Sequence, residues 1–537
     1  MSSPALALST SAAPRTINPW FVAAAVVVPT FMEVLDTTIA NVALRYIAGG
    51  LSAAVIDSEW VITSYLAANA IILPISGWLA AHFGRRNYFL ASIAVFTLSS
   101  GLCGMSTSLG QLILFRVLQG LAGGGLQPCT QGVLLDAFPP EKQGSAMTLF
   151  AVAGLLAPIL GPSLGGYITD NYSWRWIFYI NIPMGAIAFA ASYFLLQDPE
   201  YLKKERADLR RGPLNFDTIG LVLLATVMIC WEVVLSKGQQ WDWFGDPFWR
   251  VQTLTAMMVV SLVLLIYRSQ SVAAPIVNFR PLAERNFAVA SIVIFCAYGV
   301  LYAISTSLPG LLQSLFNYDA TSSGFVMSPS GFFSVALLPI VAILLGRGVD
   351  ARKLIIAGLL VMGAGCYWMS QMNLSISPFL VVWPRVLSIM GLSLIFAPIN
   401  VAAYMYTPKH LRGAAVGLFS LLRNEGGSVG TSMAQTIHER RDQFHALRLG
   451  ESLDPFSPNV NSFLEGAQTF FYEHTGDAAT SQDMALEMLA NIREQQSSSL
   501  AYFDVFWLAS ILALALVGLV FFMKRSVAEK GAHIGAE

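Results

Sequence analysis

Long apolar runs separated by short polar segments extend over almost the whole chain. A membrane with a hydrocarbon core roughly 30 Å thick requires about 20 apolar residues for each spanning helix. Polar residues interrupt the pattern most in the ninth and tenth runs. The pattern predicts an all-α polytopic membrane protein with fourteen transmembrane helices, near residues 20–44, 59–81, 88–107, 111–135, 144–168, 175–196, 217–235, 248–267, 287–311, 322–345, 353–372, 378–403, 413–437 and 502–523.

The composition agrees with a chain whose main solvent is lipid. Of its 537 residues, 55% are hydrophobic and only 12% are charged, whereas soluble domains are roughly a quarter charged. The net charge of -1 gives no electrostatic reason to expect a nucleic-acid partner. The cysteines lie in apolar runs without metal-ligand spacing, which predicts packing roles and no metal site; they are Cys103, Cys129, Cys230, Cys296 and Cys366.

Basic residues are distributed unevenly between the two sides of the predicted helices. If the N-terminus is cytoplasmic, twenty basic residues fall in the inside segments, and the short outside loops hold only Arg45, Arg175, Lys237 and Arg250. Cytoplasmic loops carry the excess of Lys and Arg in membrane proteins. We therefore expect a multi-pass protein of the cell (inner) membrane, with both termini in the cytoplasm.

The chain repeats itself at an offset of 269 residues. This register superposes Gly77 on Gly346, Arg116 on Arg385, Pro139 on Pro408, Gly144 on Gly413, Phe150 on Phe419 and Gly161 on Gly430. Duplicated halves are typical of secondary transporters with a central site and alternating access. The predicted organisation is a cytoplasmic tail 1–19, an N-terminal six-helix half 20–196, a cytoplasmic loop 197–216, an inserted two-helix hairpin 217–267, a cytoplasmic linker 268–286, a C-terminal six-helix half 287–523 and a cytoplasmic tail 524–537.

Three short motifs occur in the N-terminal half. Residues 77–86 read Gly-Trp-Leu-Ala-Ala-His-Phe-Gly-Arg-Arg and predict a tight cytoplasmic turn, with candidate residues Gly77, Gly84, Arg85 and Arg86. Residues 112–120 place Arg116 inside the fourth helix, in Arg-Val-Leu-Gln-Gly. In the fifth helix, small residues and prolines at three- and four-residue spacing predict one face for close backbone approach and bending; they are Gly154, Pro158, Gly161, Pro162, Gly165 and Gly166.

Together these motifs resemble the major facilitator superfamily, and most of all its fourteen-helix drug/proton antiporters of the EmrB/QacA type. The first loop is similar to the superfamily signature Gly-x-Leu-x-x-x-x-Gly-Arg-Arg/Lys, and the fifth helix to the antiporter signature Gly-Pro-x-x-Gly-Gly. The stretches Leu35–Thr37 and Trp174–Pro183 resemble the fourteen-helix branch specifically. The resemblance covers roughly residues 20–525 and implies the major-facilitator fold and an antiport function.

The sequence departs from the family pattern in three places. Ala81 replaces the acid of the first loop, although the repeat keeps Asp350 at the equivalent position. Arg45 stands where relatives often have Pro, and Glu232 in the seventh helix is an acid the resemblance does not imply. The first departure weakens an acid-gated role for the 77–86 loop.

Ionisable residues inside the predicted helices are the candidate functional groups, because burying a charge in a membrane costs at least a few kcal/mol. Glu33 and Asp36 are three residues apart and share a helical face, and Arg116 lies at a similar depth to Asp36. A static salt bridge between the first and fourth helices is one interpretation. Two acids against one base leave an excess carboxylate, which favours proton coupling by Asp36 and Glu33 with Arg116.

The C-terminal half contains further candidates for substrate binding or coupling. Arg385 is the repeat counterpart of Arg116, with a structural arginine capped by carbonyls as the alternative. Arg423 and Glu425 lie mid-helix, either as a local pair or as cavity residues. Glu232, near the outer end of its helix, is expected to reach the membrane interface.

The sequence argues against an enzyme and for a gradient-driven transporter. It contains no Walker A motif, Ser-His-Asp constellation or metal cluster, so we expect no cofactor and no direct use of ATP. We expect a proton-coupled multidrug efflux transporter that exports amphipathic or aromatic toxic compounds by alternating access. The alternatives are a dedicated exporter of one metabolite, such as a siderophore or amino-acid derivative, and a non-transporting receptor or scaffold.

The polar segment 439–501 is predicted to form a long loop outside the membrane. Its stretches 461–474 and 482–496 are expected to be helical. It is either a solvated excursion without a partner or a docking site. The resemblance implies, for double-membrane bacteria, a periplasmic adaptor protein that leads to an outer-membrane channel.

Overall fold

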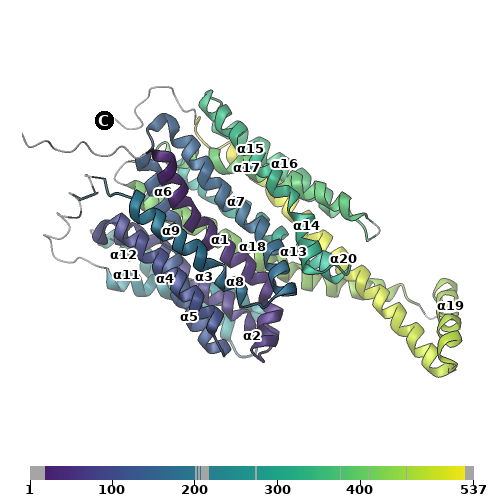
Figure 1. Cartoon of the computed structure of the whole chain (residues 1–537). Helices are drawn as coiled ribbons and strands as arrows, with labels where there is room; N and C mark the ends of the chain where they lie inside the picture. Colours follow the sequence, from purple (N-terminus) through teal and green to yellow (C-terminus); the bar gives the residue numbers. More distant parts are fainter. Residues whose placement is uncertain are drawn as a thin grey trace, which may run out of the picture.

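The computed structural model describes residues 18–199, 202–203, 206, 217–272, 275–374, 376–408, 411–454 and 456–526. This part of the chain is built of helices that lie side by side (Figure 1). The N-terminal half comprises α1 (Pro19–Gly50), α2 (Val55–Ser58), α3 (Trp60–Phe83), α4 (Arg85–Met105), α5 (Leu109–Gly123), α6 (Leu126–Ala137), α7 (Pro140–Asn171), α8 (Trp176–Tyr179) and α9 (Asn181–Leu195). The remainder comprises α11 (Thr218–Lys237), η1 (Trp243–Gly245), α12 (Arg250–Ser271), η2 (Arg280–Ala283), α13 (Arg285–Ser314), α14 (Ala320–Met327), α15 (Pro329–Gly346), α16 (Ala351–Ser370), α17 (Pro378–Tyr404), α18 (Arg412–Glu451), α19 (Pro458–Thr475) and α20 (Ala478–Val520).

Each of the fourteen predicted membrane segments coincides with a helix or with two consecutive helices. Among the described residues, twelve helices are long and apolar enough to cross a membrane, and the bent α7 gives a thirteenth. The one remaining predicted segment, 413–437, forms the start of α18. It is helical but carries too many polar residues to meet the same criterion. Fourteen spans therefore stay a prediction. The tail 1–17, most of the loop 197–216 and the tail 527–537 lie outside the described residues.

The two halves use the same helix contacts, which agrees with the sequence repeat. In the N-terminal half α1 packs along α7, and in the C-terminal half α13 packs along α18. A Cβ atom at Gly161 would collide with Thr38 of α1, and one at Gly430 would collide with the backbone of Gly299 in α13. Both crossings therefore depend on a glycine at the repeat-related position.

Helix α7 bends where the sequence places its prolines. Its segments Ser145–Pro158 and Leu160–Asn171 meet at 40°, because a proline inside a helix removes a hydrogen bond and displaces the preceding turn. The bend also divides the predicted glycine face. Gly161 and Gly165 contact α1 of their own half, whereas Gly154 faces Tyr298 of the C-terminal half, so the small residues do not form one sliding surface.

The inserted hairpin consists of α11 and α12. Helix α11 packs against α3 and contacts α18. Helix α12 packs against α11, and only four of its residues are buried, namely Val251, Ser261, Leu265 and Ser269. In the connecting turn Arg250 donates to Asp246 through Nη2 at 3.0 Å, and the Arg250 guanidinium holds the pKa of Asp246 below its usual range. In the described residues the hairpin thus joins the two halves mainly through α11.

The predicted outer loop 439–501 is an arm of helices. Helix α18 continues through residue 437 to Glu451, α19 follows, and α20 begins at Ala478, so the predicted helical stretches are confirmed. The arm extends beyond the bundle, with α19 at its far end (Figure 1). Asp504 of α20 binds His445 of α18 at 2.8 Å, and Ser497 donates to Asp442 at 2.7 Å. The helices are longer than predicted, because solvent-exposed helices lack the apolar runs that mark membrane segments.

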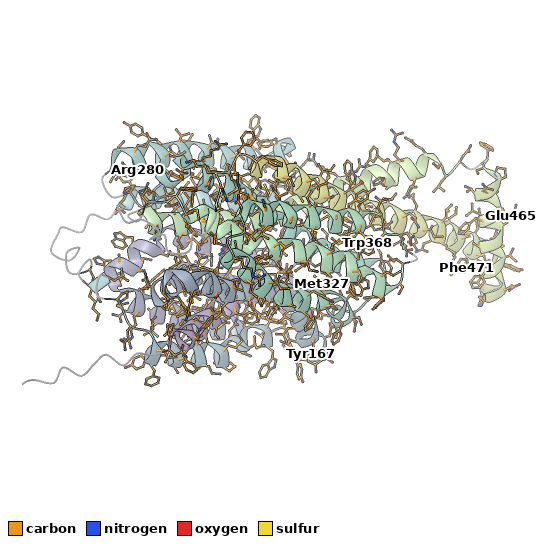
Figure 2. All side chains as sticks on the ribbon, turned by 90° about the horizontal axis from the view of Figure 1, so that it is seen from above. Tyr167, Arg280, Met327, Trp368, Glu465 and Phe471 are labelled. Carbon is orange, nitrogen blue, oxygen red and sulfur yellow. The ribbon has the colours of Figure 1, made fainter. Side chains whose placement is uncertain are left out.

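Thiol labelling tests the orientation predicted from the basic residues. Glu465 on α19 and Arg280 in η2 lie at opposite ends of the molecule (Figure 2) and are both exposed. In spheroplasts an impermeant maleimide should label Glu465→Cys, and should label Arg280→Cys only after permeabilisation. The native cysteines serve as the low-background control because four are buried and Cys296 is half-buried. The reverse labelling pattern would contradict the predicted orientation.

Candidate transport cavity

A cavity of about 200 Å³ lies where α1, α3, α7, α11, α13 and α18 meet. It extends from mid-bundle toward the end of the molecule that carries the arm. At the opposite end the halves are close together, and a Cβ at Gly417 of α18 would lie 3.4 Å from the Leu73 carbonyl of α3. The walls combine aromatic rings with a few polar groups, as ligand sites do; these residues include Glu33, Asn69, Gln127, Phe150, Glu232, Tyr298, Tyr302 and Arg423.

Glu33 is the acid of α1 that lines this cavity. Its side chain is only 3% exposed, and Asn69 of α3 donates to its Oε1 at 3.0 Å. Gln127 of α6 is within hydrogen-bonding reach of the same carboxyl. Arg423 of α18 donates to the Gln127 carbonyl oxygen, and its guanidinium lies over the rings of Phe150 and Tyr298. A chain of polar groups therefore runs from Glu33 in one half to Arg423 in the other.

Asp36 occupies a different environment, inside the N-terminal half. Arg116 Nη1 donates to its Oδ2 at 2.5 Å, and Gln119 and Asn181 donate to its Oδ1 at 3.0 and 2.6 Å. Arg116 is fully buried and lies over the Tyr65 ring at 4.2 Å. The structure thus brings Asp36 and Arg116 together as an ion pair with both carboxylate oxygens occupied, and Asp36 is not among the described cavity-lining residues.

The C-terminal half lacks the corresponding acid. At the repeat offset Asp36 corresponds to Ser305 and Glu33 to Tyr302. Arg385, the counterpart of Arg116, is fully buried and donates to Ser305 at 2.8 Å, while its Nε and Nη1 have no hydrogen-bond partner. The geometry of the pair is retained but its negative charge is missing, so this arginine is buried without a counterion.

Glu425 and Arg423 do not form a local pair. Arg423 points to Gln127, whereas Glu425 lies on another face of α18, where it meets Glu232 of α11. Glu232 is only 3% exposed and accepts a hydrogen bond from Ser428 at 3.0 Å. The expectation that Glu232 reaches the membrane interface was wrong, because α11 packs against α3 and α18 and encloses this carboxyl.

The 77–86 motif forms the turn between α3 and α4. Gly84 has φ +88°, a conformation that favours glycine, and Arg86 donates through its backbone to Asp198 at 2.8 Å. Arg85 forms an ion pair with Asp136 at the end of α6. A Cβ added at Gly77 would lie 3.9 Å from the Gly413 carbonyl oxygen of α18. The motif therefore ties α3, α4, α6 and the segment after α9 together next to the contact between the halves.

A helical membrane bundle with duplicated halves around a polar cavity is the architecture of a secondary transporter. A sequence profile of the Major Facilitator Superfamily matches residues 26–431. The multidrug export protein EmrB of Escherichia coli (strain K12) is 34% identical over 512 residues, which cover 94% of this chain and 96% of that protein. The fatty acid resistance protein FarB of Neisseria gonorrhoeae is 33% identical and covers 92% of this chain and 94% of its own length. The chain belongs to the Major Facilitator Superfamily, in the branch that contains EmrB.

A solved structure supports the fold. The human organic anion transporter MFSD10 (TETRAN) superposes with a TM-score of 0.55 over 94% of this chain and 100% of its own, at 12% identity. At that identity the likeness concerns the fold alone. Membership of this transporter family confirms the expected major-facilitator architecture.

Removal of the Asp36 carboxylate should destabilise the N-terminal half. Asp36→Asn leaves Arg116 buried without a counterion, which costs about 3–5 kcal/mol, so the melting temperature in detergent should fall markedly. Asp36→Asn combined with Arg116→Gln removes the unpaired charge and should recover part of the loss. Equal stability of the wild type and Asp36→Asn would contradict a structural role for this pair.

Supplying the missing charge in the C-terminal half should have the opposite effect. Ser305→Asp places a carboxylate beside Arg385, and a hydrogen bond to a charged group contributes roughly 1–3 kcal/mol, so the melting temperature should rise. Ser307→Asp, two residues away and without an adjacent arginine, is the control and should be destabilising. A fall in both variants would show that Arg385 does not accept a counterion there.

Proposed function

We propose that the protein is a proton-coupled multidrug efflux transporter that exports amphipathic or aromatic toxic compounds by alternating access. The observation that carries this proposal is the cavity between the halves, which combines a buried carboxyl at Glu33 with aromatic walls. The names of the relatives, a multidrug export protein and a fatty acid resistance protein, support the amphipathic substrate class.

Glu33 is the residue proposed to carry the coupling proton. It lines the cavity, and the side chains that hydrogen-bond to it, Asn69 and Gln127, are neutral. The surroundings of a carboxyl in such a place change when the cavity closes on one side and opens on the other, and its proton affinity changes with them. Protonation from outside lowers affinity for the substrate, and loss of the proton to the cytoplasm restores it. Asp36 and Arg116 act as positioning residues that hold α1 against α5.

The arm is proposed to dock a periplasmic adaptor protein that leads to an outer-membrane channel. None of the residues of α19 is buried. Large aromatic side chains are exposed on α19, namely Phe470 (57%) and Tyr472 (49%). Exposed apolar groups of this kind mark protein contact sites when they gather on one element. This role places the protein in the inner membrane with both termini cytoplasmic.

Transport in proteoliposomes tests the coupling. Proteoliposomes that contain the wild-type protein should accumulate a fluorescent amphipathic dye under an imposed pH gradient, and the dye should cause proton movement across the membrane. Glu33→Gln has no exchangeable proton, so uphill transport should fall at least tenfold while dye binding persists. Glu473→Gln, an exposed acid on α19, is the matched control and should transport normally. Full uphill transport by Glu33→Gln would remove Glu33 from the coupling site.

A further inference from the structure

A second pair of acids lies across the contact between the inserted hairpin and the C-terminal half. Glu232 of α11 and Glu425 of α18 are 3% and 6% exposed, and their carboxyl groups are within hydrogen-bonding reach of each other. Glu425, Ser428 and Ser432 are spaced so that they share one face of α18. Ser428 donates to Glu232 at 3.0 Å, and Ser432 donates to the Leu235 carbonyl at 2.5 Å.

The pair has no cationic partner in the described part of the chain. Arg423, on the same helix, donates to Gln127 and lies over Phe150. Lys237 of α11 is bound to Glu59 of α3 at 2.9 Å. The other titratable groups of the cavity wall nearby are Glu33 of α1 and the tyrosines Tyr298 and Tyr302 of α13. Among the described residues, the two cations on these helices nearest the pair, Arg423 and Lys237, are therefore both engaged elsewhere.

Two adjacent buried acids are stable only with an added positive charge, which is either a proton or a bound cation. Two carboxylates in contact repel each other strongly when both are ionised, so one of them holds a proton. Glu425 lies within hydrogen-bonding reach of the Trp231 indole and of Glu232, but its buried Oε2 accepts no hydrogen bond of good geometry, although buried polar groups are almost always paired. Glu232 lines the cavity, whereas Glu425 is not among its described lining residues, so the pair is reached from the substrate space through Glu232.

The cavity also offers an aromatic surface beside the pair. Tyr302 packs against α18 next to Ser428, since a Cβ at Gly427 would lie 3.0 Å from its ring. Aromatic rings and carboxylates together are the groups that bind quaternary ammonium and similar organic cations. No group of three or more metal-ligating side chains occurs in the described residues, so this site is not suited to a divalent metal ion.

We propose that Glu232 and Glu425 form a cation site in the wall of the transport cavity, where a lipophilic organic cation takes the place of one shared proton. Binding of the cation releases that proton to solvent. Both carboxyl groups are then ionised and face the bound cation. The inserted hairpin thereby contributes a specificity-determining residue, Glu232, to the cavity. Its transport consequence rests on the proposed efflux function, whereas the binding step does not.

Binding to the purified full-length protein tests the site directly. Tetraphenylphosphonium should bind to the wild type with release of about one proton per cation, as followed by a pH-indicator dye in weak buffer. Glu232→Gln and Glu425→Gln should each weaken this binding at least tenfold and abolish proton release. Glu451→Gln, an exposed acid at the end of α18, is the matched control and should behave as the wild type.

The same variants are compared in transport of a cationic and a neutral amphipathic dye. If the variants lose transport of the cationic dye but not of the neutral dye, the proposal is supported. Melting temperatures close to that of the wild type exclude misfolding as the cause. If Glu425→Gln is unstable, Glu232→Gln alone decides, because the amide retains the hydrogen bond from Ser428. Wild-type tetraphenylphosphonium binding by Glu232→Gln, or equal loss of both dyes, overturns the cation site. Absence of all dye transport by the wild type would instead refute the efflux function and leave the binding result intact.

Discussion

A charge buried in this bundle is costly unless it finds a partner within the protein, because lipid offers none. The ion pair of Asp36 and Arg116 satisfies this constraint most completely, with Gln119 and Asn181 on the second carboxylate oxygen. It joins α1 to α5 and brings in α9 through Asn181. The position of α1 then determines where Glu33 stands, one helical turn away on the cavity side. The carboxyl proposed to carry the coupling proton is thus placed by a structural one.

The two halves solve the same packing problem with different chemistry. Gly161 and Gly430 allow equivalent helix crossings, and Arg116 and Arg385 occupy equivalent positions. Yet the acids of α1 correspond to Ser305 and Tyr302 in α13. The repeat therefore supplies the frame, whereas the acidic chemistry on this helix pair is confined to the N-terminal half. The C-terminal half contributes its cavity charges from α18 instead.

Sequence patterns predicted the helices, the repeat and the Asp36–Arg116 contact, because apolar length and helical spacing are local properties. The bend of α7 was also predicted from Pro158 and Pro162. The contact between Glu232 and Glu425 was not, because the inserted hairpin has no copy in the repeat against which its position could be judged. The serines at 428 and 432, in register with Glu425, were the only local signal that this face of α18 meets another helix. The helices of the arm were underestimated in extent because water, unlike lipid, imposes no apolar pattern on them.

The continuity of α18 has a mechanical consequence. Its 40 residues run without interruption from the contact between the halves, past Arg423 and Glu425, into the arm. At 1.5 Å per residue the helix is about 60 Å long, so a tilt of about 5° about its N-terminal end displaces its far end by roughly 5 Å. A protein that holds the arm therefore opposes or favours that tilt. If this tilt accompanies opening of the cavity, binding of such a protein and the opening are thermodynamically linked, and each biases the other by the same free energy.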